Sequence, residues 1–124
     1  MDTSPKRENP LKDKSYNFAL RIVKAYKHLV FEQKEYVLSK QMLRSGTSIG
    51  ANIAEANQAQ SRPDFISKLG IALKETVETE YWLQLLRDGE FITRTQAESL
   101  IADGLEIKAI LTASIKSTKQ GKLT

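Results

Sequence analysis

A row of polar residues in the middle of the chain has the residue types and the spacing to do chemistry. The row consists of Arg44, Ser48, Asn52 and Glu55. Steps of three or four residues place these side chains on one side of a helix. The spacing predicts a hydrogen-bonded network at a helix–helix or subunit contact, because polar groups are tolerated there only when they are bonded. In that network Arg44 and Glu55 pair with each other or with other subunits; the alternative is a row that contacts a ligand or RNA.

Residues able to catalyse a reaction or to bind a metal are scarce. The chain has no cysteine, which excludes a thiol nucleophile, a disulfide and a thiolate metal site. His28 is the single histidine, whereas a di-metal site in a helix bundle needs Glu-x-x-His pairs on two helices. Ser48 has no evident base, and Gly46 and Gly50 fall inside a helix rather than in a phosphate-binding loop. We therefore expect no catalytic, cofactor-binding or metal site, no small-molecule substrate and no enzyme activity.

Apolar residues recur at intervals of three and four along most of the chain, and no segment alternates as a half-buried strand would. This periodicity predicts four helices, at about 14–31, 36–59, 62–88 and 94–119. The links between them are short, which makes neighbouring helices antiparallel. We expect an all-α fold with one domain over residues 14–120, an antiparallel up-down-up-down four-helix bundle.

The ends of the chain and its hydropathy bear on where the protein resides. Residues 1–13 are highly charged and are expected to be a disordered leader, and residues 121–124 a short tail. No apolar run approaches the roughly 18 to 20 residues that span a bilayer, and no apolar segment that could serve as a secretory signal follows the leader. We expect no membrane contact and a cytoplasmic location, which the absence of cysteine also fits.

The second predicted helix, 36–59, contains two interior glycines, each of which costs about 1 kcal/mol relative to alanine. The spacing Gly46-x-x-x-Gly50 allows helices to approach closely, but the polar residues around it exclude a membrane span. We expect a neighbouring backbone to lie close to these glycines. The helix is predicted to be one continuous rod with neighbours around most of its circumference.

Two adjacent aromatic residues, Tyr81 and Trp82, lie late in the third predicted helix. Consecutive side chains on a helix point about 100° apart, so both cannot face one core. Because aromatic residues are enriched at interfaces, we expect one of the two to contact another subunit or to cover the bundle surface.

The net charge of +4 is unevenly distributed, with +5 on residues 1–62 and −1 on residues 63–124. A positive balance of this size is compatible with binding to nucleic-acid phosphates. The lysines that are candidates for such contacts are Lys24, Lys27, Lys108, Lys116 and Lys119. Taken alone, the charge favours a simpler interpretation, a solvated surface with a basic tail.

Two consecutive segments resemble a known family. Residues 43–65 read LRSGTSIGANIAEANQAQSRPDF, and residues 69–86 read LGIALKETVETEYWLQLL. They are similar to the bacterial four-helix-bundle proteins related to the product of large-subunit rRNA intervening sequences. The family pattern Arg-Ser…Ser-Ile…Asn-Ile-Ala-Glu is present from Arg44 to Glu55, and the resemblance covers about 15–119.

The resemblance implies antiparallel four-helix bundles assembled as ring-shaped homopentamers. The family is similar in fold to an accessory protein of diversity-generating retroelements, a basic pentamer that binds nucleic acid and a reverse transcriptase. We accordingly expect a non-enzymatic homopentamer that binds RNA or an RNA-containing complex through basic surfaces. The alternative is a protein-interaction scaffold without direct nucleic-acid binding, which presents the acidic region 75–106 or the surface of Tyr81 and Trp82. Many relatives carry glycine where this chain has Ala56, which predicts a straighter end to the second helix.

Overall fold

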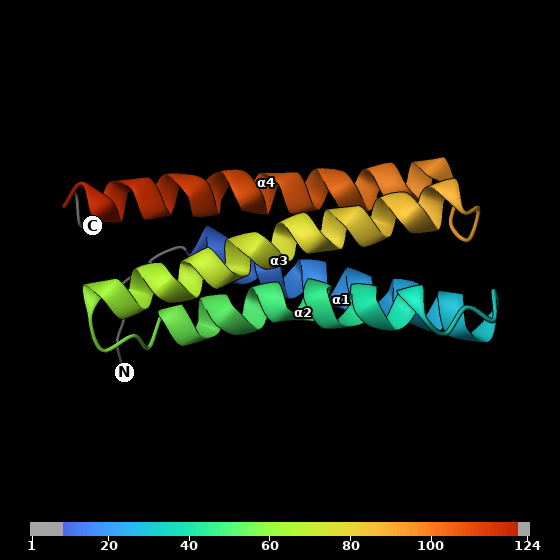
Figure 1. Ribbon diagram of the computed structural model, residues 1–124, viewed down its shortest axis with the longest axis horizontal. Helices are drawn as coiled ribbons and strands as arrows, with labels where there is room; N and C mark the ends of the chain where they lie inside the picture. The colour runs from blue at the N-terminus through green and yellow to red at the C-terminus, as the bar shows by residue number, and fades with distance from the viewer. Residues whose placement is uncertain (1–8, 122–124) are drawn as a thin grey trace, which may run out of the picture.

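Four helices form an antiparallel bundle in the computed structural model, which describes residues 9–121 (Figure 1). The helices are α1 (Pro10–Phe31), α2 (Leu38–Ala56), α3 (Arg62–Asp88) and α4 (Arg94–Lys119). Each helix packs on the next, and α4 packs on α1, while α1 and α3 lie on a diagonal, where their backbones do not approach closely. The all-α up-down-up-down bundle predicted from the periodicity is confirmed. Within residues 9–121, no helix is both long enough and apolar enough to cross a membrane.

A continuous apolar core fills the space between the helices. Its largest fully buried side chains are Phe18, Ile22, Leu29, Met42, Ile49, Ile53, Leu69, Leu83, Leu86, Ile107 and Leu111. All four helices contribute, and each buried aliphatic or aromatic side chain of this size stabilises the fold by about 1.5–3 kcal/mol. The core orients the four helices and so determines which side chains remain on the outside.

Helix α1 begins earlier than the sequence pattern indicated. The side chain of Asn9 accepts a hydrogen bond from the backbone N–H of Lys12 at 3.1 Å, and Pro10 occupies the first helical position. Proline is well suited to that position because its fixed φ matches the helix and its missing N–H is not needed there. The expectation of a disordered leader is therefore wrong for residues 10–13. Residues 1–8, and residues 122–124 of the expected tail, lie outside the described residues.

Helix α2 is shorter than the predicted 36–59 at both ends. At its start, Glu35 Oε1 accepts the backbone N–H groups of Val37 (3.1 Å) and Leu38 (2.8 Å). Glu35 Oε2 accepts that of Ser39 (2.6 Å), so one carboxylate caps the first turn. At its end the chain leaves the helix after Ala56 and turns toward α3. The predicted extension of the helix to residue 59 is therefore wrong, whereas α3 and α4 have the bounds predicted.

The two interior glycines of α2 face α1. A Cβ atom on Gly50 would lie 3.4 Å from the backbone oxygen of Ser15, and one on Gly46 would lie 2.8 Å from Ile22 Cγ1. The predicted close approach of a neighbouring backbone is confirmed at Gly50. At Gly46 the close neighbour is a branched side chain instead. Both contacts hold α1 and α2 of the same chain together.

Candidate functional site

The polar row of α2 lies along the rim of the contact between α2 and α3. Arg44 forms an ion pair with Glu78 and a second, at 3.6 Å, with Glu75. Trp82 Nε1 donates a hydrogen bond to the same Glu78 carboxylate at 3.1 Å. The hydrogen bond to Glu78, followed by the charges of Glu75 and Glu78, raises the pKa of Arg44 above its ordinary value. Arg44 is therefore positively charged, and the carboxylates of Glu75 and Glu78 on α3 neutralise this charge within the protomer.

The other members of the row also have partners within the chain. Glu55 pairs with Lys68 of α3 at 3.1 Å. Ser48 Oγ donates to the backbone oxygen of Arg44 at 2.6 Å, and Asn52 Nδ2 donates to the backbone oxygen of Ser48 at 2.8 Å. A direct pair between Arg44 and Glu55 does not form, because eleven residues along one helix separate them by roughly 16 Å. Each of the two binds α3 instead. Ser48 and Asn52 are half-buried, whereas Arg44 and Glu55 at the two ends of the row are exposed. The expectation that neighbours surround most of α2 is therefore not met on this side of the helix, which water partly reaches.

The predicted lysines do not form one patch on the protomer. Lys24 and Lys27 are exposed on α1, and Lys24 borders a cavity of about 320 Å³ beside Leu100 of α4. Lys116 and Lys119 are exposed in the last turns of α4. From Leu100 to Lys116 the helix rises by roughly 24 Å, which puts these lysines near the opposite end of the bundle. The remaining lysine of the set is Lys108, which is half-buried.

A cationic residue that the sequence pattern did not single out joins the lysines at the end of α4. Arg62, in the first turn of α3, places Nη1 3.9 Å from the position of a Cβ on Gly121, just after α4. Within residues 9–121, none of Arg62, Lys116 and Lys119 forms an ion pair. We call these three residues the basic end. The sequence signal for Arg62 is weak, because the pattern Ser61–Arg62–Pro63–Asp64 indicates a helix start and not a basic surface.

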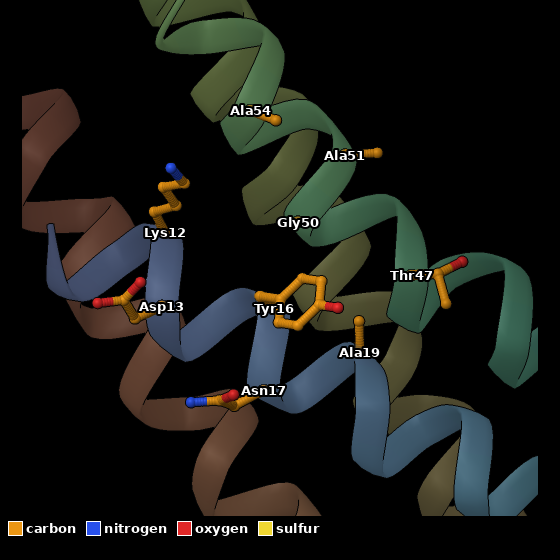
Figure 2. Close-up of a pocket in the computed structure, with 9 residues that line it drawn as sticks. All are labelled: Lys12, Asp13, Tyr16, Asn17, Ala19, Thr47, Gly50, Ala51 and Ala54. Atoms are coloured by element: carbon orange, nitrogen blue, oxygen red, sulfur yellow. The ribbon is translucent and has the colours of Figure 1, made fainter.

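A groove with apolar walls runs between α1 and α2, with a volume of about 610 Å³ (Figure 2). Small residues line most of it: Ala19, Thr47, Gly50, Ala51 and Ala54. The ring of Tyr16 extends from α1 toward α2 and remains 64% exposed. Lys12, Asp13 and Asn17 border the groove on α1. We refer to this feature as the α1–α2 groove.

A second apolar surface lies on the outward side of α3. Val77 is 50% exposed and Tyr81 55% exposed, and Gly70, seven residues before Val77, has no atom within 4 Å of its Cβ position. Leu85, 37% exposed, continues the surface toward the end of the helix. We call these four residues the α3 ridge. Their spacing of four and seven residues is present in the sequence, but the same helix also carries a stripe of buried apolar residues with the same periodicity.

The two adjacent aromatic residues of α3 point in different directions, as expected. Tyr81 is exposed, whereas Trp82 is half-buried and packs against the core. Their rings meet edge to face, with centroids 5.1 Å apart and an angle of 71° between the planes. Tyr81 thus covers part of the bundle surface and leaves much of its ring in contact with water.

These features define a small all-α bundle whose candidate binding residues lie on its outer surfaces. Within the described part of the chain, no group of three or more acidic residues and histidine is placed to hold a metal ion. The chain belongs to the 23S rRNA-intervening sequence protein family, which matches residues 7–113. The family resemblance read from residues 43–86 is thereby confirmed.

A solved structure supports the same assignment. The chain is similar to a protein of unknown function from the S23 ribosomal protein family of Bacteroides thetaiotaomicron VPI-5482, whose crystal structure was determined at 1.70 Å resolution. The two chains are 66% identical, with a TM-score of 0.85, over 86% of this chain and 95% of the other. No curated protein matches the chain at a significant level.

Proposed function

We propose that the protein is a non-enzymatic homo-oligomer, a pentamer, that binds RNA or an RNA-containing complex through basic surfaces. The observation that carries the proposal is the basic end, where Arg62, Lys116 and Lys119 form no ion pair with any acidic residue between positions 9 and 121. Cations without such partners are available to phosphates, which supply most of the affinity in non-specific nucleic-acid binding. The family name, which refers to 23S rRNA, supports RNA as the ligand.

Assembly strengthens the electrostatic part of the proposal. One chain has a net charge of only +4, and five copies carry +20. A field of that size attracts a polyanion over a Debye length, about 8 Å at physiological salt. Repeated weak contacts on one assembly also raise the overall affinity without any new contact being made.

The test is a mobility shift of labelled structured RNA at low salt, with the wild type and two charge-matched double variants. We expect micromolar wild-type protein to retard the RNA, and the retardation to weaken as salt rises. Lys116→Glu with Lys119→Glu is expected to lower the affinity about tenfold or more. Lys24→Glu with Lys27→Glu makes the same charge change on α1 and is expected to have a smaller effect. Unchanged RNA mobility with the wild type at low salt would refute RNA binding.

The second candidate function is a protein-interaction scaffold, which the exposure of Tyr81 favours. Exposed aromatic residues are common anchors at protein interfaces. A pull-down that recovers one protein partner after nuclease treatment, together with unchanged RNA mobility, would replace the RNA proposal with this one.

A further inference from the structure

A cavity of about 320 Å³ lies between α1 and α4, close to where α1 ends and α4 begins. Arg21, Lys24 and His28 line it from α1, and Gln96 lines it from α4. We propose that this cavity, which we call the α1–α4 cavity, binds a small organic carboxylate that carries an apolar group. The site goes beyond the proposed function, because the basic end lies near the opposite end of the bundle and shares no residue with the cavity.

Helix α1 places three of these polar side chains on one side, because they are three and four residues apart. The guanidinium of Arg21 is held against α4, where Nη2 donates a hydrogen bond to Ser99 Oγ at 2.9 Å and Nη1 pairs with Asp103 at 2.5 Å. The ion pair with Asp103 fixes the side chain in place and neutralises its charge. Arg21 therefore forms one wall of the α1–α4 cavity without adding net charge to it.

Lys24 supplies the uncompensated positive charge of the cavity. It is exposed and forms no ion pair with any acidic residue between positions 9 and 121. No acidic residue in this part of the chain lines the cavity. Glu98 pairs with Arg94 at 3.6 Å, and Glu90 borders a neighbouring cavity that shares His28. A single uncompensated charge suits a monoanion better than a dianion such as a phosphate monoester, which would bring a surplus negative charge.

Gln96 and His28 add further hydrogen-bond donors to the cavity. Gln96 Oε1 accepts the backbone N–H of Thr93 at 3.0 Å in the capping box, so Gln96 Nε2 is the end of the amide that remains for a ligand. The imidazole of His28 supplies a ring N–H. An ammonium group beside such donors matches a carboxylate, whose two oxygens accept several hydrogen bonds. Hydrogen bonds to a charged acceptor are also stronger than those between neutral groups.

The rest of the cavity lining is apolar. Ile92 and Leu100 are 8% and 5% exposed, and Ala25 is half-buried. The cavity volume of about 320 Å³ equals that of about ten water molecules at roughly 30 Å³ each, which leaves room for a ring beside the carboxylate. A mainly apolar lining with a few polar groups is typical of small-molecule sites. The phosphodiester of RNA, also a monoanion, joins two polar riboses and so matches this lining less well.

The experiment is a titration of the full chain with benzoate at constant pH and ionic strength, followed by NMR. His28 is the single histidine of the chain, so its ring C–H signals report on the cavity without overlap from another histidine. We expect benzoate to shift these signals until the site is saturated. Acetate has the charge without the ring, and benzyl alcohol has the ring without the charge, so each is expected to bind about tenfold more weakly or worse. No saturable shift with benzoate, or equal binding of either control compound, would overturn the proposal.

Two variants test whether the polar residues of the cavity hold the benzoate. Gln96→Glu has little effect on the fold, because glutamate also completes a capping box, but it replaces the amide donor with a negative charge. Lys24→Gln removes the uncompensated charge at an exposed position. Each variant is expected to weaken benzoate binding about tenfold or more, with unchanged circular dichroism.

The matched controls make the same chemical changes at exposed positions elsewhere. Gln58→Glu lies at the opposite end of the bundle, and Lys74→Gln lies on α3, the helix diagonal to α1. Both controls are expected to bind benzoate as the wild type does. Undiminished binding in Gln96→Glu or in Lys24→Gln would place the ligand elsewhere and overturn the proposal. A short single-stranded RNA is expected to leave benzoate bound, and its displacement by the RNA would assign the cavity to phosphates instead of a carboxylate.

Discussion

Glu35 is a buried acidic residue at the start of α2. Glu35 is only 8% exposed, and burial raises the pKa of its carboxyl group. Hydrogen bonds from the backbone N–H groups of Leu38, Ser39 and Val37 outweigh that effect and hold the pKa below the ordinary value of 4.5. The positive end of the α2 dipole acts in the same direction. Glu35 thus caps α2 as an anion.

Replacement of Glu35 by glutamine is expected to destabilise the protein by about 1–3 kcal/mol at neutral pH, because a neutral amide cannot replace two charged acceptors. The pKa is lower in the folded state than in the unfolded state, so the stabilisation is present above the ordinary value of 4.5. It is lost as pH falls through the folded-state pKa. Urea unfolding of both proteins from neutral to strongly acidic pH tests this.

The control for this prediction is Glu32→Gln, which changes an exposed carboxylate in the same link. It is expected to leave the free energy of unfolding within about 0.5 kcal/mol of the wild type. A stability difference between wild type and Glu35→Gln that stays constant across the pH range would contradict the anionic cap.

The contact between α1 and α2 leaves no room for an added methyl group at Gly46. A Cβ on Gly46 would lie 2.8 Å from Ile22 Cγ1 and 2.9 Å from Ile22 Cγ2. The β-branched side chain of Ile22 has few rotamers, so it cannot turn away without moving the helix. The glycine therefore determines how closely the two helices pack, and with it the spacing of the α1–α2 groove on their outer side.

The substitution Gly46→Ala is expected to lower the free energy of unfolding by about 1–3 kcal/mol, because overpacking outweighs the better helix propensity of alanine. Gly104→Ala is the matched control in α4, since its Cβ would meet Phe18 Cζ at an ordinary 3.7 Å. The control is expected to gain up to about 1 kcal/mol. Chemical denaturation measures both, and equal stability of the two variants would contradict the close packing.

At the scale of the whole molecule, different kinds of surface are separated around and along the bundle. Ion pairs occupy the rim between α2 and α3 and the rim between α1 and α4. The basic end lies where α3 begins and α4 ends, and apolar side chains line most of the α1–α2 groove and the α3 ridge. The basic end shares no residue with either apolar surface, so the proposed RNA contact does not require them.

The proposed self-assembly predicts that thermal stability depends on protein concentration. A subunit that binds the folded state stabilises it by mass action, so the Tm of the wild type is expected to rise with concentration. Thermal unfolding followed by circular dichroism over a hundredfold range of concentration measures the Tm. A wild-type Tm that does not change with concentration would count against assembly.

Much of the architecture followed from local patterns. The start of α3 at Ser61, whose side chain accepts from the N–H of Asp64, and the capping box from Thr93 to Gln96 depend on hydrogen bonds between residues three apart. Such bonds form between residues that are close in the sequence, so the residue types alone predict them. The missed starts are also local. Asn9 and Pro10 are common signals of a helix start, but they lie in a highly charged segment that is typical of a disordered leader. The carboxylate of Glu35 is a less common cap than serine or threonine.

By itself, the sequence determined the number, order and type of the elements, the apolar stripes and the family. Only the tertiary structure decided that Arg44 binds Glu78 rather than Glu55, that Arg62 joins Lys116 and Lys119, and that a groove and a ridge remain uncovered. The physical reason is that the helical repeat determines only which residues share one side of the same helix. Which neighbour that side meets, or whether it meets water, depends on how all four helices pack around one core.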